Sequence, residues 1–281
     1  MFKRSESFFL GQHKTRLFYQ VWEPQQVRGH LVITHGHSEH SGSYLRLIEG
    51  IKDLSLAVYA WDLRGHGRSE GKRGYARDFE DYIKDCQHFI QHLRDERGLY
   101  PKDLLVLGHS MGGLVQLKML YDNPHWNFKA QVLSSPLLGV ALEVPIYKDI
   151  AALLFQGLAP WITLGNEIQY DNLTRDPEIV AEFKADVLRH SRISSGVYLG
   201  AIRAIETLRQ GISKIELPTL LQIAEHDPVI SSEACQDFFR KLGSPDKEIK
   251  IYPDRKHEIY NDLGREEVYK DLVSFLNQHL S

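Results

Sequence analysis

LLVLGHSMGGLVQLKMLY, residues 104–121, is the stretch that decides the fold. Residues 104–107 form an apolar run typical of a strand buried on both faces, and residues 113–121 have the pattern of a helix. The motif G-x-S-x-G stands between them, from Gly108 to Gly112. A strand-to-helix turn this sharp requires strained backbone at the serine, and the glycines make room for it. Ser110 is therefore expected to project from the C-terminal edge of a sheet.

Five other apolar runs end in glycine or in a polar turn. They cover residues 31–34, 57–61, 130–133, 219–223 and 248–252. Helical patterns lie between several of these runs, and the clearest repeats apolar residues at three- and four-residue spacing from Phe79 to Leu93. Further helices are predicted over residues 233–242 and 266–280. This alternation predicts an α/β fold with a mostly parallel central sheet and helices on both faces.

Two regions depart from the alternation. Residues 7–10 and 16–22 flank Gly11 and predict an antiparallel hairpin at one edge of the sheet. Residues 137–217 contain no convincing buried strand, and prolines and a glycine punctuate helix-like pieces there. The sequence therefore predicts a core built from residues 1–136 and 218–281, with residues 137–217 inserted as a helical cap.

The stretch from Ile150 to Leu164 within this cap is almost entirely apolar. One interpretation is that it packs against the core. The other is that it lines a tunnel for an acyl chain or makes transient contact with a membrane surface, because an apolar face beside a reactive site suits a lipid. Both interpretations stay open at the level of sequence.

Composition restricts the class of protein. The chain has 281 residues, 42% of them hydrophobic, and is long enough to bury the core of one large domain. A net charge of −3 provides no basic face for a phosphate backbone, so nucleic acid is not an expected partner. Cys86 and Cys235 fall at apolar helical positions and are expected to be buried thiols. No apolar segment follows the basic N-terminus and no run could span a bilayer, so we expect a cytoplasmic protein, with any membrane contact peripheral. The oligomeric state is not indicated.

A serine hydroxyl is a weak nucleophile unless a base removes its proton, so Ser110 requires a histidine and an acid later in the chain. The expected order is Ser, Asp, His. Asp227 follows the predicted strand 219–223 and is the preferred acid, with Glu225 as an alternative and Asp254 less favoured because it is too close to the base. His257 lies in the loop between the last predicted strand and the last helix, where the general base is expected. Ser110, Asp227 and His257 thus form the predicted triad.

Hydrolysis by such a triad also requires an oxyanion hole, made of two N–H groups aimed at the charge that develops on the substrate carbonyl. The backbone N–H of Met111, directly after the serine, is one predicted donor. The backbone N–H of His37, in the loop after residues 31–34, is the other.

The same loop allows a competing interpretation. His35, His37 and His40 stand close together in a pattern like the H-x-H-x-D-H zinc motif of metallo-β-lactamase-like hydrolases. The acidic position of the motif holds Glu39 instead of aspartate, and the serine site already has a use for this loop, so we expect no metal. Residues 62–69 resemble a phosphate-binding loop but lack its spacing, and a tight turn explains their glycines.

Several of these motifs together resemble the monoacylglycerol lipase and lysophospholipase family of α/β-hydrolases. They are H-G-H-S-E-H-S-G-S-Y at 35–44, residues 62–69, G-H-S-M-G-G at 108–113, Asp227 and His257. The resemblance spans nearly the whole chain and is loosest in the cap. It implies a serine esterase that releases a fatty acid from a monoacylglycerol or a lysophospholipid, a small lipid ester, without a cofactor.

The resemblance also bears on the head group of the substrate. Glu39 matches a glutamate that helps to receive glycerol in this family. The eukaryotic members carry an arginine just before the tyrosine of the first loop, where this chain has Ser43. Other activities of the same scaffold, thioesterase or serine aminopeptidase, share the triad, and a non-catalytic binding protein of this fold usually lacks one of its members.

Overall fold

A computed structural model of the chain describes residues 2–141, 159 and 161–280. Its centre is an eight-stranded sheet with the order β1-β2-β4-β3-β5-β6-β9-β10. The strands are β1 (Lys3–Leu10), β2 (Arg16–Glu23), β3 (Gly29–Thr34), β4 (Leu56–Trp61), β5 (Leu104–His109), β6 (Ala130–Ser134), β9 (Thr219–Ala224) and β10 (Lys247–Tyr252). All six predicted buried runs are strands of this sheet.

Six strands are parallel to one another, in the sheet order β4-β3-β5-β6-β9-β10. Strand β2 runs antiparallel to both β1 and β4. The predicted hairpin is thus confirmed at one edge, although both of its strands are longer than the sequence indicated. Strand β5 lies between β3 and β6, so that Gly108 pairs with Thr34 on one side and Leu133 on the other. This central place explains why its residues read as a continuous apolar run.

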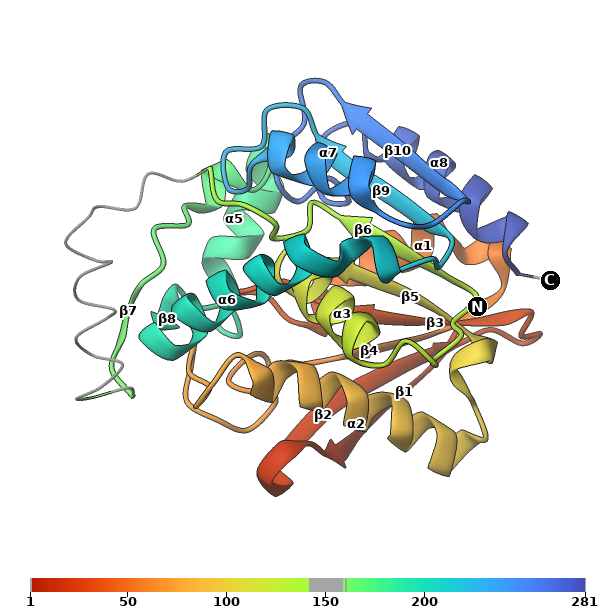
Figure 1. The fold of residues 1–281 in the computed structure, drawn as a ribbon, viewed down its shortest axis with the longest axis horizontal. Coiled ribbons are helices and arrows are strands. Elements are labelled where there is room, and N and C mark those ends of the chain that lie inside the picture. The colour runs from red at the N-terminus through yellow and green to blue at the C-terminus, as the bar shows by residue number, and fades with distance from the viewer. Residues whose placement is uncertain (1, 142–158, 160, 281) are drawn as a thin grey trace.

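Helices cover both faces of the sheet, as predicted (Figure 1). The described helices are α1 (Leu45–Gly50), α2 (Glu80–Arg97), α3 (Met111–Asp122), α5 (Pro177–Ala185), α6 (Ser195–Gly211), α7 (Ser232–Lys241) and α8 (Arg265–Gln278). Short 3₁₀ turns cover Gln12–Lys14, Ser41–Tyr44, Lys52–Leu54, Pro101–Asp103, Tyr170–Asn172 and Ile212–Lys214. Alternate residues of one strand serve opposite sides: Val106 packs with α2 and α3, while Leu105 and Leu107 pack with α1 and α8.

The segment between β6 and β9 contributes α5, α6 and two short strands outside the main sheet, and we call this segment the cap. Strands β7 (Thr163–Gly165) and β8 (Arg192–Ser194) pair antiparallel. Neither was predicted, because each has only three residues and does not form an apolar run. The cap boundaries at 137 and 217 stay a prediction. Most of the apolar stretch from Ile150 to Leu164 lies outside the described residues, so both interpretations of it remain open.

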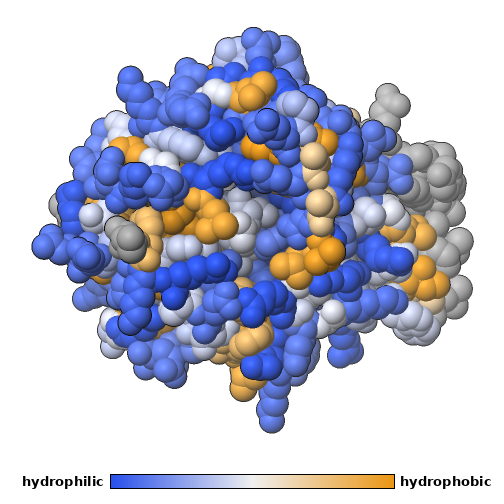
Figure 2. All heavy atoms as spheres, turned by 180° about the vertical axis from the view of Figure 1, so that it is seen from behind, coloured by the Kyte–Doolittle hydropathy of each residue, from blue (hydrophilic) through white to orange (hydrophobic). Residues whose placement is uncertain are grey.

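Hydrophilic side chains dominate the back of the molecule, where hydrophobic residues form small separate groups (Figure 2). Both cysteines are buried and unpaired, as expected, and burial raises the pKa of the Cys86 thiol to about 12. In the part of the chain that the structure describes, no helix combines the length and the apolar character needed to cross a bilayer.

Candidate active site

Ser110 occupies the turn between β5 and α3, and its backbone is strained. Its φ of 50° and ψ of −121° lie in a region that non-glycine residues rarely adopt. The turn depends on close approach of the backbone: a Cβ on Gly112 would lie 2.2 Å from the Thr34 carbonyl oxygen, and one on Gly108 would lie 2.7 Å from Gly113 Cα. The motif therefore contains glycine at these positions because β3, β5 and α3 meet there.

The structure brings the three residues of the predicted triad together. His257 Nε2 lies 2.9 Å from Ser110 Oγ, and His257 Nδ1 lies 2.8 Å from Asp227 Oδ2. The three side chains come from the loops after β5, β9 and β10, which end at the same edge of the sheet. All three residues are buried. If Nδ1 carries the proton that Asp227 accepts, Nε2 is left free to accept the proton of the serine hydroxyl.

The charges around His257 favour that arrangement. Burial of the imidazole opposes its protonation, but the carboxylates of Asp227, Glu258 and Glu39 together outweigh burial, and the pKa of His257 is raised. Burial likewise opposes ionisation of Asp227, yet His257 and the backbone N–H groups of Val229 and Ile230 lower its pKa. Asp227 is thus held as a carboxylate that orients the imidazole.

The alternative acids do not take this place. Glu225 and Asp254 are both exposed to solvent. The carboxylate bonded to His257 Nδ1 belongs to Asp227. Asp227, the acid preferred from the sequence, is therefore the one that contacts His257.

The two predicted oxyanion donors belong to residues beside the serine. Met111 is the first residue of α3, and His37 lies in the loop after β3. Both residues line the same cavity as Ser110. The ring of His37 also contacts the cap, because its Nε2–H donates to the Arg192 carbonyl oxygen at 3.0 Å. The loop that carries one predicted donor is thereby attached to β8.

The cavity that opens at Ser110 is mainly apolar. Its apolar lining comes from the segment after β6, from the loop before α7, from β7 and the residue before it, from β8 and from α6. It includes Leu137, Val140, Ile162, Leu164, Ile193, Val197, Ala201, Ile202, Ile205, Val229 and Ile230. Such a surface suits a hydrocarbon chain better than a charged or sugar-like group.

Glu39 lies behind this cavity and is not among the residues that line it. Its carboxylate accepts hydrogen bonds from the Gly36 N–H at 2.6 Å and from the Tyr44 hydroxyl at 2.9 Å. Burial and the nearby carboxylate of Glu258 raise the pKa of Glu39 to about 7. Its predicted contact with a head group stays a prediction.

Sequence reasoning missed Arg189. This cap residue is buried, and its guanidinium lies 3.3 Å from Ser43 Oγ and 4.0 Å from Glu39 Oε2. The eukaryotic members of the family carry an arginine within the first loop, where this chain has Ser43. No local signal could have found it, because the residue that reaches this spot is 146 positions away in the chain.

The histidines of the first loop do not converge. His35 Nε2 accepts the Leu63 N–H, whereas His40 Nε2 lies 2.8 Å from the Asp186 carboxylate in the cap. Within residues 2–141, 159 and 161–280, no cluster of three or more His, Cys, Asp or Glu side chains has an arrangement that could hold a metal. The zinc interpretation therefore lacks a ligand set among these residues.

The loop at 62–69 is a tight turn organised by Asp62. Its carboxylate accepts the N–H groups of Ser41 and Arg68, each at 2.7 Å. His66, at the centre of the turn, is buried and lies 3.3 Å from the His37 ring. The loop thus supports the neighbouring first loop.

Known proteins resemble the chain over nearly its whole length. The family model described as serine aminopeptidase S33 matches residues 25–264. A monoacylglycerol lipase of Mycolicibacterium smegmatis is 32% identical over 280 residues, which cover 99% of this chain and 98% of the relative. A phospholipase of Bacillus subtilis is 27% identical, with 92% of this chain and 99% of the relative covered.

Solved structures agree with these relatives. The crystal structure of a monoacylglycerol lipase from Paleococcus ferrophilus superposes with a TM-score of 0.82 at 29% identity, and 99% of each chain is covered. A monoglyceride lipase of Saccharomyces cerevisiae, solved with a substrate analogue, gives a TM-score of 0.85 at 21% identity, with 98% and 95% covered. The latter likeness concerns the fold, which is that of the α/β-hydrolases.

Proposed function

Because this chain belongs to the serine aminopeptidase S33 family, among the monoacylglycerol lipases and lysophospholipases, and is a serine ester hydrolase, we propose that it cleaves monoacylglycerols with Ser110 as the nucleophile. The observation that carries the proposal is the hydrogen-bonded series Ser110–His257–Asp227 at an apolar cavity. The side chains that we propose as nucleophile, base and acid lie at hydrogen-bonding distance from one another.

The reaction proceeds through an acyl-enzyme. His257 Nε2 takes the hydroxyl proton of Ser110 while Oγ attacks the ester carbonyl, and the N–H groups of His37 and Met111 stabilise the resulting oxyanion. When the carbonyl re-forms, the bond to the glycerol oxygen breaks and His257 gives that oxygen its proton. Water, deprotonated by His257, then attacks the acyl-serine carbonyl. The bond from the acyl carbon to Ser110 Oγ breaks, His257 returns the proton to Oγ, and the fatty acid is released. Asp227 stabilises the imidazolium in both halves.

The apolar cavity supports an acyl chain as the group retained on the serine. Its lining offers few polar partners to that group. The names of two relatives, monoacylglycerol lipase and phospholipase, denote action on lipids. Glu39 is proposed to help receive the glycerol head group. The apolar part of the cap is proposed to touch a membrane surface transiently, on a protein that is otherwise cytoplasmic.

Replacement of Ser110 by alanine tests the chemistry. The variant is expected to fold and to lose turnover of a 4-nitrophenyl ester by at least about 10⁴-fold, and to lose labelling by a fluorophosphonate probe. A variant with full activity would contradict the nucleophile, and a wild-type protein that the probe cannot label would favour a non-catalytic binding protein.

A panel of substrates tests the choice of ester. Monoacylglycerols of increasing chain length, lysophospholipids, acyl thioesters and aminoacyl amides are assayed side by side by kcat/KM. We expect the highest values with monoacylglycerols. A preference for lysophospholipids, thioesters or amides would identify the enzyme as a lysophospholipase, thioesterase or aminopeptidase instead.

A further inference from the structure

Arg189 is a buried cation that the cap delivers to the back of the active site. It lies between α5 and β8, and its side chain is only 1% exposed. The guanidinium bonds to both carboxylate oxygens of Glu258, at 3.0 and 3.3 Å. It also lies against the ring of Phe183, 3.6 Å from the ring centre. A buried guanidinium with these contacts restricts the positions of the carboxylates that it binds.

Its partners are two acids that lie around the proposed base. Glu258 directly follows His257 in the chain, and Glu39 Oε2 lies 4.0 Å from the guanidinium. Although burial opposes ionisation, Arg189 lowers the pKa of Glu258, whereas the pKa of Glu39 is raised to about 7. One cation is thus shared between two buried carboxylates, both of which raise the pKa of His257.

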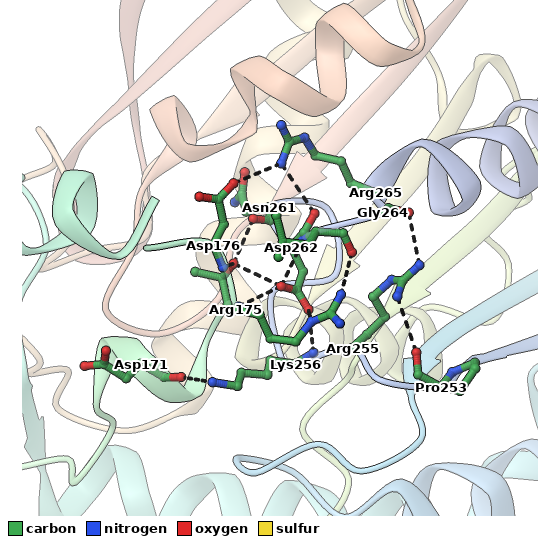
Figure 3. Close-up of polar contacts among 12 residues, drawn as sticks. Asp171, Arg175, Asp176, Pro253, Arg255, Lys256, Asn261, Asp262, Gly264 and Arg265 are labelled. Carbon is green, nitrogen blue, oxygen red and sulfur yellow. Dashed lines mark hydrogen bonds and ion pairs between the residues drawn. The ribbon is translucent and has the colours of Figure 1, made fainter. Parts of the chain in front are cut away.

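The cap segment before Arg189 is attached to the same loop at several other points. The Leu173 carbonyl accepts the Glu258 N–H at 2.8 Å. Figure 3 shows the second group of contacts, in which the Asp262 carboxylate receives the side chain of Arg175 and the backbone N–H of Lys256. The backbone on which Arg189 is carried is therefore docked on the loop of His257.

We propose that Arg189 is a positioning residue of the site: a cation supplied by the cap that balances Glu39 and Glu258 and holds the loop that carries His257. The proposal rests on the role of His257 as the base. In this proposal the cap contributes a charge to the site as well as covering the acyl chain.

The sign of the effect follows from the charges that face His257 and Arg189. His257 faces Asp227 and Glu258, Glu39 of the first loop, and the buried His109 ring at 4.9 Å, whose pKa burial lowers to about 3. Arg189 faces Glu258, Glu39, Tyr170 and Asp186. Asn261 also donates an N–H to Glu258 Oε2 at 2.9 Å, so Glu258 keeps a partner that favours its ionised form when the cation is removed. With Glu258 still ionised, the surroundings of His257 become more negative without the cation. Its protonated form, which cannot act as a base, then persists to higher pH.

The test is the pH dependence of kcat/KM for 4-nitrophenyl butyrate, a substrate that does not titrate, in the Arg189→Gln variant. Relative to wild type, we expect kcat/KM to fall about tenfold more at about pH 6 than at about pH 8.5, because the charge change acts mainly on protonation of the base. A residue with a merely structural role would lower activity equally at both pH values.

A relocated cation provides the rescue. In Ser43→Arg/Arg189→Gln, a guanidinium returns from the first loop to the same carboxylates, since Ser43 Oγ lies 3.3 Å from the native one. We expect it to restore the wild-type ratio of kcat/KM at the two pH values. If Arg189→Gln alone does not fold, the double variant is expected to restore folding as well. A double variant that restores neither overturns the proposal.

Arg175→Gln is the matched control, because it removes another cap arginine that bonds the same loop, at Asp262. It should lower stability while leaving the pH ratio unchanged. An unchanged ratio in folded Arg189→Gln overturns the role of Arg189 alone. A wild-type enzyme without an acid limb, or a Ser110→Ala variant that turns over ester, would contradict the proposed function instead.

Discussion

Arg175 Nε of the cap lies 3.1 Å from Oδ2 of Asp262, whose side chain is fully buried. The other carboxylate oxygen accepts the backbone N–H of Arg175 at 2.7 Å and that of Leu263 at 2.9 Å. The Lys256 N–H donates to Oδ2 at 2.8 Å, and the Thr174 hydroxyl lies 3.2 Å from Oδ1. Hydrogen bonds to the backbone hold the pKa of Asp262 down against the opposing effect of burial. One charged group thus joins the cap to the loop of the proposed base (Figure 3).

Replacement of Asp262 by asparagine is expected to lower the free energy of unfolding by about 2–4 kcal/mol. The amide removes the charge and turns an N–H group toward donors, which leaves Arg175 without its partner. Urea denaturation measures the change. Asp171→Asn is the control, because this exposed side chain forms a surface ion pair with Lys184, and its replacement should cost less than about 0.5 kcal/mol. Equal losses in both variants would contradict the anchoring role of Asp262.

Replacement of Asp227 by asparagine is expected to lower kcat by about 10³- to 10⁴-fold at neutral pH, with little change in KM. An amide no longer stabilises the imidazolium and can hold the ring of His257 in the wrong tautomer. Steady-state kinetics with a soluble ester measure the loss. Glu225→Gln, in the same loop but exposed, should stay within about twofold of wild type. Full activity of Asp227→Asn would return the role of the acid to another residue.

The activity of the wild-type enzyme is expected to fall with decreasing pH on a single limb. Only neutral His257 can accept the Ser110 proton, and Asp227 raises the pKa of His257, so activity is present above that pKa and lost as pH falls through it. A profile of kcat/KM between about pH 5 and 9 records the limb. In Asp227→Asn the limb should move to lower pH, and a move to higher pH would contradict the assigned pair.

Replacement of Ala201 by phenylalanine tests the apolar cavity as the acyl site. Ala201 lies on α6 and lines the cavity, so a ring there occupies space for the chain. We expect kcat/KM for a dodecanoyl ester to fall by about 10- to 100-fold and that for an acetyl ester to change by less than about threefold. Glu206→Phe places the same ring on the exposed side of α6 and should affect neither ester. Equal losses for both esters would argue against this cavity.

The architecture and the main candidates for the site could be predicted from sequence because each depends on local pattern. Buried parallel strands read as apolar runs, and the Ser110 turn needs glycines that a short motif reveals. Asp227 and His257 could be proposed because each directly follows a recognisable strand. The three-residue strands β7 and β8 were missed, since tertiary contacts and not an apolar run define them.

By itself, the sequence determined the sheet, its helical layers and which residues stand at the ends of adjacent strands, because burial on both faces imposes a readable pattern. Only the tertiary structure decided the distances at which Ser110, His257 and Asp227 meet and the burial of Glu39. It alone revealed that the cation beside Ser43 is Arg189 from the cap. The physical reason is that charge pairing acts through space: a buried carboxylate needs a nearby cation, and any part of the chain that packs there can provide it.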